Sequence, residues 1–292
     1  MRRRKLLRWL IWMTGCGLVI GSIVLWWIGG ALVAPANCVV GPPPGDLPVE
    51  SFTLPSKSGS TVAAWYVPHE KARATAILLH PIRGNRRSML TRAKLFYHAG
   101  YSVLLIDLQA HGESPGEHIT VGHLERHDVA AAVDFVRNKT PDHAIVVVGR
   151  SLGGAAALLG SPLGIDALVL ESVYPTIEEA VDNRIRMRLG SLSNVITPLL
   201  VWQLPLRLGI SPDKLRPIDH MASIGCPVLV MAGDQDRHTT SAETRRMFEA
   251  AKEPKELVFF EGAGHEDLLA YDPHQYGTAV LGFLARHLNT KP

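Results

Sequence analysis

The sequence predicts an α/β fold in which a mainly parallel sheet of about eight strands is covered by helices on both faces. Short apolar runs rich in β-branched residues recur throughout the chain after residue 49, and helical patterns separate the later runs. Parallel neighbours need crossover connections, which are usually helices, so this alternation favours a parallel sheet. About 240 residues are available for it, enough for one large core.

The N-terminal segment, residues 1–30, is predicted to be a transmembrane anchor. Five basic residues and no acid lie in positions 1–8, and Trp9–Ile28 carries no charge. Twenty helical residues span about 30 Å, the thickness of a bilayer core. The basic flank predicts a cytoplasmic N-terminus with the catalytic domain on the extracytoplasmic side. A signal peptide cut after Ala34-Pro35-Ala36 is the alternative, although the apolar run is longer than such peptides have.

Residues 31–48 are rich in proline and glycine and are predicted to form a stiff, extended linker to a domain at 49–292. Cys38 in this linker and Cys226 could form a disulfide outside the cytoplasm, but three cysteines in all do not define a disulfide framework. Since five of the thirty basic residues lie in positions 1–8, the remaining chain is slightly acidic. No nucleic-acid partner is therefore expected.

The strands and helices of the domain follow from the apolar patterns. The first two strand-like runs are joined only by residues 57–60, which predicts an antiparallel hairpin. The strand-like runs lie at 50–54, 61–67, 74–79, 102–108, 145–149, 167–171, 227–232 and 256–260. The helical patterns lie at 86–99, 121–138, 152–160, 239–252 and 273–288.

A Gly-x-Ser-x-Gly motif at residues 149–153 lies between a predicted strand and a predicted helix. This context is typical of a nucleophile elbow, a sharp turn that holds the serine clear of the sheet. Glycines are needed there because the neighbouring chain approaches closely. Ser151 is therefore the candidate nucleophile; an ordinary glycine-rich turn is the alternative.

Two later strands end in residues that could activate this serine. Asp236 follows the run at 227–232, and His265 follows the run at 256–260. This chain order, Ser…Asp…His, resembles the α/β-hydrolase family, and the resemblance covers nearly everything after residue 50. It implies an α/β-hydrolase fold and a hydrolase in which His265 is the general base and Asp236 orients it.

Two other residues are candidates for the acid that orients His265. Asp234 lies two residues before Asp236, where a turn-capping role is expected, and Glu171 ends the run at 167–171, where some family members place the acid.

His111 belongs to an Asp-x-x-x-His-Gly-x-Ser pattern that resembles a structural loop of the family. It is expected to stabilise that loop.

The oxyanion of the reaction needs backbone N–H donors. The family pattern implies Leu152, directly after the nucleophile, and a donor from the loop after the run at 74–79. Family members usually carry His-Gly in that loop, whereas this chain has His80-Pro81. Proline has no N–H, so the second donor is expected at Ile82.

Residues 175–216 are too long for an ordinary connection and are helical in pattern. In this family an insertion at this point commonly makes a cap over the active site; a peripheral helical pair is the alternative. Its arginines, Arg184, Arg186 and Arg188, are expected on a solvated face. Its apolar residues are expected to form pocket walls or a membrane-facing surface: Met187, Leu189, Ile196, Leu199, Leu200 and Trp202.

The expected function is hydrolysis of a carboxylic ester or thioester through an acyl-Ser151 intermediate, without a cofactor or metal. The anchor and apolar cap favour an acyl or lipid-derived substrate. A serine peptidase of the aminopeptidase or prolyl-oligopeptidase type is the enzymatic alternative. A non-catalytic binding module on the same fold is the other, because a fold alone does not determine function.

Overall fold

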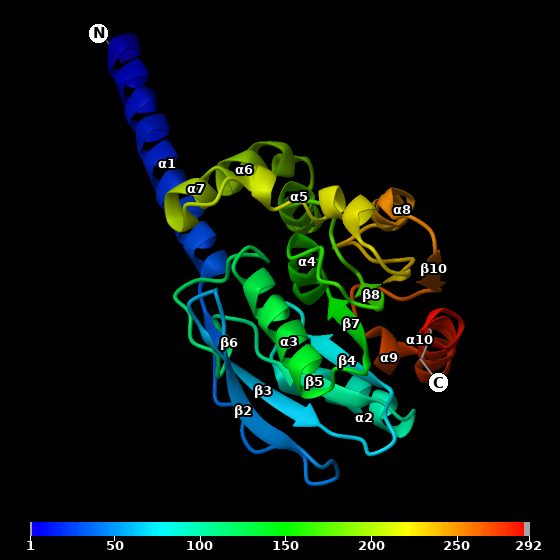
Figure 1. The fold of residues 1–292 in the computed structure, drawn as a ribbon. Coiled ribbons are helices and arrows are strands. Elements are labelled where there is room, and N and C mark those ends of the chain that lie inside the picture. Colours follow the sequence, from blue (N-terminus) through cyan, green and yellow to red (C-terminus); the bar gives the residue numbers. More distant parts are fainter. Residues whose placement is uncertain (1, 289–292) are drawn as a thin grey trace.

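The computed structural model describes residues 2–288, and an eight-stranded sheet lies at its centre (Figure 1). Its strand order is β10-β9-β8-β7-β4-β5-β3-β2; neighbours from β10 to β5 are parallel, and β3 and β2 continue the sheet antiparallel. The predicted mainly parallel sheet and its initial hairpin are thus confirmed. The strands are β2 (Glu50–Pro55), β3 (Thr61–Val67), β4 (Ala74–Leu79), β5 (Ser102–Ile106), β7 (Ala144–Arg150), β8 (Ala167–Glu171), β9 (Val228–Gly233) and β10 (Lys255–Phe260).

Helices cover both faces of the sheet, as predicted. Side chains alternate between the faces along a strand. In β4, Ile77 and Leu79 join one core while Ala76 and Leu78 join the other, and all four are fully buried. The sequence of a strand that is buried on both faces is a nearly continuous apolar run. One face packs on α3 (Glu125–Lys139), α4 (Leu152–Leu159) and α8 (Ser241–Ala250), and the other on α2 (Leu90–His98) and α10 (Pro273–His287).

The helix α3 begins at Glu125, four residues later than the sequence pattern predicts. The Glu125 carboxylate accepts hydrogen bonds from the backbone N–H groups of Thr120 and Gly122, at 2.8 and 2.9 Å. Val121 between them has φ +55°. These bonds hold residues 120–122 in a turn, where sequence periodicity alone indicates helix.

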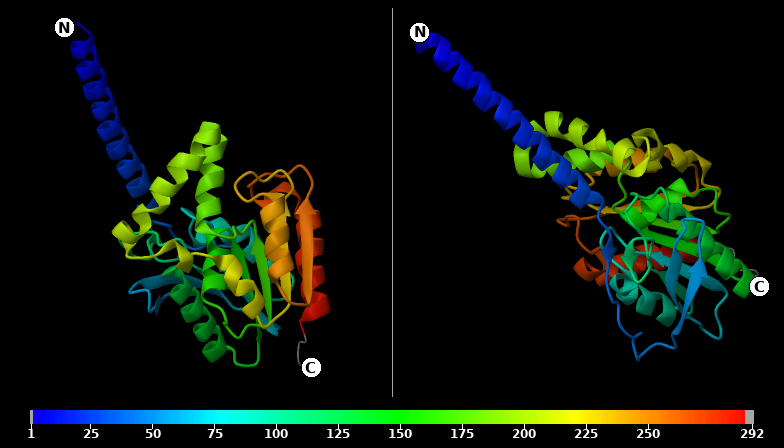
Figure 2. Two further views of the ribbon diagram at one scale, coloured as in Figure 1. Left: turned by 90° about the horizontal axis from the view of Figure 1, so that it is seen from above. Right: turned by 90° about the vertical axis from the view of Figure 1, so that its left-hand side faces the viewer.

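The N-terminal helix α1 (Arg2–Val33) stands clear of the domain over most of its length (Figures 1 and 2). Its Lys5–Val33 stretch contains 18 consecutive residues with a mean hydropathy of 2.1 and is long and apolar enough to cross a membrane. The stretch Ile177–Leu208 meets the same criteria, with a mean hydropathy of 1.2 over 18 residues. That second stretch is broken into separate helices and packs on the domain, so we treat α1 as the candidate span.

The expected linker, residues 31–48, does not form a free spacer. The helix α1 continues to Val33, and β1 (Ala36–Asn37) pairs in parallel with β6 (His111–Gly112). Val40 and Leu47 are buried against the domain. The backbone groups of this extended segment form hydrogen bonds with the domain, and its buried apolar side chains pack against it. The segment therefore lies along the surface of the domain. Cys38 and Cys226 are both unpaired.

The insertion at 175–216 contains three α-helices, which lie above α4 in Figure 1. They are α5 (Ile177–Leu189), α6 (Ser193–Val201) and α7 (Gln203–Leu208). We call residues 175–216 the cap. Both α6 and α7 contact α1.

Candidate active site

Ser151 occupies the turn between β7 and α4 with φ +48° and ψ −111°. This backbone conformation is strained for serine and is held by the surrounding chain. A Cβ on Gly149 would lie 2.5 Å from the backbone of Gly154, and one on Gly153 would lie 2.5 Å from the Leu79 carbonyl oxygen. The motif therefore carries glycine where strand and helix come too close for any side chain.

Asp236 and His265 are brought together from the ends of two neighbouring strands. The Asp236 Oδ2 and the His265 Nδ1 are 2.7 Å apart. Burial alone would raise the pKa of Asp236, but the His265 hydrogen bond and the N–H groups of Thr239 and His238 outweigh it and hold this pKa below its usual value. An ionised carboxylate fixes the His265 tautomer with hydrogen on Nδ1, which leaves Nε2 free to accept a proton.

The two other candidate acids are engaged elsewhere. The Asp234 carboxylate accepts from the Gly262 N–H at 2.7 Å and so joins two loops. Glu171 is buried and accepts two hydrogen bonds from Arg92, at 2.9 and 2.5 Å, and one from the Tyr276 hydroxyl. Among residues 2–288, the carboxylate that bonds to the His265 ring is that of Asp236 and neither of these two. The geometry favours Asp236 as the orienting acid.

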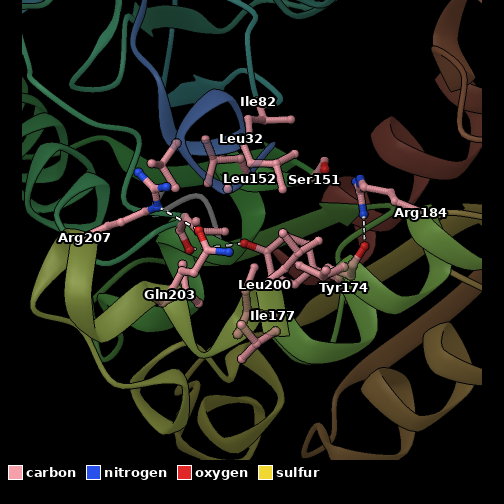
Figure 3. A pocket seen from close by; sticks show the side chains of 17 residues that line it. Leu32, Ile82, Ser151, Leu152, Tyr174, Ile177, Arg184, Leu200, Gln203 and Arg207 are labelled. Atoms are coloured by element: carbon pink, nitrogen blue, oxygen red, sulfur yellow. Dashed lines mark hydrogen bonds between the residues drawn. The ribbon is translucent and has the colours of Figure 1, made fainter. Parts of the chain in front are cut away.

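A mostly apolar pocket adjoins the nucleophile, and Ser151, Leu152 and Ile82 all line it (Figure 3). Leu152 is the first residue of α4, so its N–H has no acceptor within the helix. The other lining residues come from α1, the cap and two loops: Gly29, Leu32, Val33, Val121, Tyr174, Ile177, Ala180, Val181, Arg184, Leu200, Val201, Gln203, Leu204 and Arg207.

The loop that carries Ile82 is held by a neutral histidine. His80 is fully buried; its Nδ1 donates to the Pro81 carbonyl at 2.8 Å and its Nε2 accepts from the Leu108 N–H at 3.0 Å. Burial, together with the nearby His111, lowers the pKa of His80 to about 3. The Gly84 N–H also bonds to the Pro81 carbonyl at 2.9 Å. These contacts order the loop around Ile82, where proline replaces the usual glycine.

His111 lies in the loop after β5, with its buried ring 5.0 Å from that of His80. Its Nδ1 donates to the Gln109 carbonyl at 2.9 Å. Asp107 of the same loop accepts from the backbone N–H of Arg86 at 2.6 Å and forms a buried ion pair with its guanidinium. These contacts agree with the expected structural role of the loop, and His111 does not line the pocket.

His238 is a site residue that the sequence analysis missed. Its ring centroid lies 4.7 Å from that of His265. Ligand atoms of Asp236, His238 and His265 lie within 4.8 Å of one another, a donor set that could hold a metal ion. The hydrogen bond between Asp236 and His265 already accounts for the placement of these two side chains. The Asp-x-His spacing was the signal available in the sequence.

The expectation of a solvated arginine face on the cap is wrong for Arg184. Arg186 and Arg188 are exposed, but Arg184 is partly buried, lines the pocket and donates to the Ala180 carbonyl at 2.7 Å (Figure 3). The inner face of α5 packs over the pocket, and Arg184 lies on that face. Of the apolar residues named above, Leu200 lines the pocket.

Comparisons with known proteins identify the family and the fold. A model of the Alpha/beta hydrolase family matches residues 76–279. The uncharacterized protein MT2364 of Mycobacterium tuberculosis is 31% identical over 256 residues, covering 83% of this chain and 84% of that protein. WAV2 of Arabidopsis thaliana, an alpha/beta hydrolase domain-containing protein, is 25% identical and covers 84% and 82%. The Pyrococcus furiosus esterase Pf2001 has a similar fold, with a TM-score of 0.73, 21% identity and coverage of 88% and 99%.

Proposed function

The chain belongs to the alpha/beta hydrolase family, and from this premise we propose that it is a serine hydrolase that cleaves carboxylic esters through an acyl-Ser151 intermediate. The hydrogen-bonded pair Asp236–His265 carries the proposal, because a serine in a nucleophile elbow needs an oriented base. The esterase fold of similar solved structures supports it.

In this mechanism the Ser151 Oγ attacks the ester carbonyl carbon while the His265 Nε2 takes its proton. The N–H groups of Leu152 and Ile82 stabilise the oxyanion, and each such donor typically contributes about 3–4 kcal/mol. The tetrahedral intermediate then collapses, the C–O bond to the leaving alcohol breaks, and His265 donates the proton to that alcohol. Water, with His265 again as base, hydrolyses the acyl-serine and restores Ser151.

A substrate panel tests the ester assignment. Full-length protein purified in detergent should hydrolyse p-nitrophenyl esters with a kcat/KM far above that for aminoacyl p-nitroanilides, because the pocket beside Ser151 is mostly apolar and suits an acyl group. The Ser151→Ala variant is the blank. A preference for the anilides would assign a peptidase. Failure to hydrolyse either class, with no labelling of Ser151 by a fluorophosphonate, would assign a binding module.

We also propose that α1 is an uncleaved anchor with a cytoplasmic N-terminus, because positive charge precedes an apolar helix of spanning length. A reporter active only outside the cytoplasm, fused after Pro292, should be active. The matched fusion lacking residues 2–30 should be inactive. An N-terminal tag should remain on the membrane-bound protein; a mature chain beginning near Asn37 would instead identify a secreted hydrolase.

A further inference from the structure

The end of α1 forms part of the wall of the active-site pocket. Gly29, Leu32 and Val33 line the same pocket as Ser151, although they belong to the candidate membrane span. Val33 is buried in the core of the domain, and its carbonyl accepts from the Ile119 N–H at 2.8 Å. The helix is therefore joined to the catalytic domain without a flexible break, and its position relative to Ser151 is defined.

The cap is fixed to the same part of α1. The Gln203 Nε2 donates to the Leu25 carbonyl at 3.1 Å, and the Arg207 guanidinium donates to the Trp26 carbonyl and lies 3.9 Å from the Trp26 ring centroid. Gly29 permits this approach, because a Cβ there would lie 2.1 Å from the Gln203 Oε1. Pocket, cap and anchor therefore meet at the last turns of α1.

The outer face of the cap is apolar and exposed. Val195, Leu199, Trp202 and Leu206 on α6 and α7 are 63, 46, 66 and 58% exposed. These side chains lie on the helices that contact α1, and Leu25 and Trp26 lie in the C-terminal part of the candidate span Lys5–Val33. If the run Trp9–Ile28 spans the bilayer, the membrane surface lies at these contacts, and the exposed face of the cap borders it.

From these contacts we infer that α1 and the cap together form a site for the acyl chain of a membrane lipid ester, which enters from the bilayer. The inference rests on the proposed ester hydrolase function and identifies its substrate class. The chain lies against Leu32 and Val33 of α1 and Leu200 and Leu204 of the cap. Its ester carbonyl lies at Ser151, beside Leu152 and Ile82 (Figure 3). The anchor is thus a substrate-binding element as well as a tether.

A chain-length profile tests the role of α1. Full-length protein in nanodiscs should prefer p-nitrophenyl laurate to p-nitrophenyl acetate. Leu32→Trp fills the pocket from α1 and Leu200→Trp fills it from the cap. Each should lower the laurate-to-acetate ratio of kcat/KM at least about tenfold, since each buried methylene improves binding about fourfold. Ile23→Trp, on the same helix but not on the pocket, should leave the ratio unchanged.

Leu32→Ala adds no volume and covers the case in which a tryptophan variant does not fold. It should move the preferred ester toward longer chains. An unchanged ratio in Leu32→Trp and an unchanged preference in Leu32→Ala, with Ser151 still labelled and acetate still hydrolysed, would overturn the inference and leave the proposed function intact. Absence of both labelling and ester hydrolysis would overturn the proposed function and the inference with it.

A second arm distinguishes the bilayer from the aqueous phase as the source of the chain. Dilauroylglycerol is placed either in the nanodisc that holds the protein or in separate, protein-free nanodiscs at equal total concentration. Entry from the bilayer predicts hydrolysis at least about tenfold faster in the shared disc. Equal rates would show that the chain enters from solution and would overturn the bilayer route.

Discussion

Replacing Ser151 with alanine should abolish covalent labelling by a fluorophosphonate and lower kcat for an ester by about 10⁶-fold, the loss found when a triad serine is removed. The expectation follows from the elbow: Ser151 has φ +48° between β7 and α4 and lines the pocket. The alanine side chain is smaller and needs no new hydrogen bond, so the variant should fold as the parent does. Labelling is read by mass spectrometry of the intact protein, and kcat by alcohol release.

Ser172→Ala is the matched control. Ser172 also follows the end of a central strand, is buried and has a positive φ of +49°. It does not line the pocket, so its variant should label and turn over as the parent does. Stoichiometric labelling of the Ser151→Ala protein at another serine would remove Ser151 from its proposed role.

Replacing Asp236 with asparagine should lower kcat by about 10⁴-fold, because a neutral amide favours the wrong His265 tautomer and leaves the imidazolium unstabilised. Asp234→Asn should have far less effect on kcat, since the Asp234 carboxylate bonds to the Gly262 N–H and not to His265. Steady-state kinetics of both variants, with circular dichroism to verify folding, makes the comparison. The reverse ranking would show that Asp234 is the orienting acid.

The Glu171→Gln variant tests the third candidate for the orienting acid, because it should lower stability without lowering kcat. Glu171 forms a fully buried ion pair with Arg92, and removing one partner of such a pair costs about 3–5 kcal/mol. The thermal midpoint should therefore fall while kcat of the folded protein remains. A loss of kcat as large as that of Asp236→Asn, at unchanged stability, would assign the acid to Glu171.

Much of the fold follows from local sequence. The runs that became β4, β7 and β9 are almost entirely apolar because both faces of these strands are buried, and this pattern does not depend on what packs against them. Gly149 and Gly153 identify the elbow for a similar reason, because a side chain at either position would collide with nearby backbone. Asp236 and His265 each follow the end of a strand, and this placement also predicted that their side chains would meet.

Other features were decided only by the tertiary structure. Extended residues 36–37 give no sign of their strand partner, because β1 pairs with a loop that lies seventy-five residues later. Arg184 resembles its neighbours Arg186 and Arg188 in sequence, and only the packing of α5 places one of the three in the pocket. Likewise, α1 after Arg8 is apolar on all sides, so no periodicity marks the side that carries Gly29 and Leu32. Sequence patterns record which side chains avoid water, whereas long-range docking decides which of them share one site.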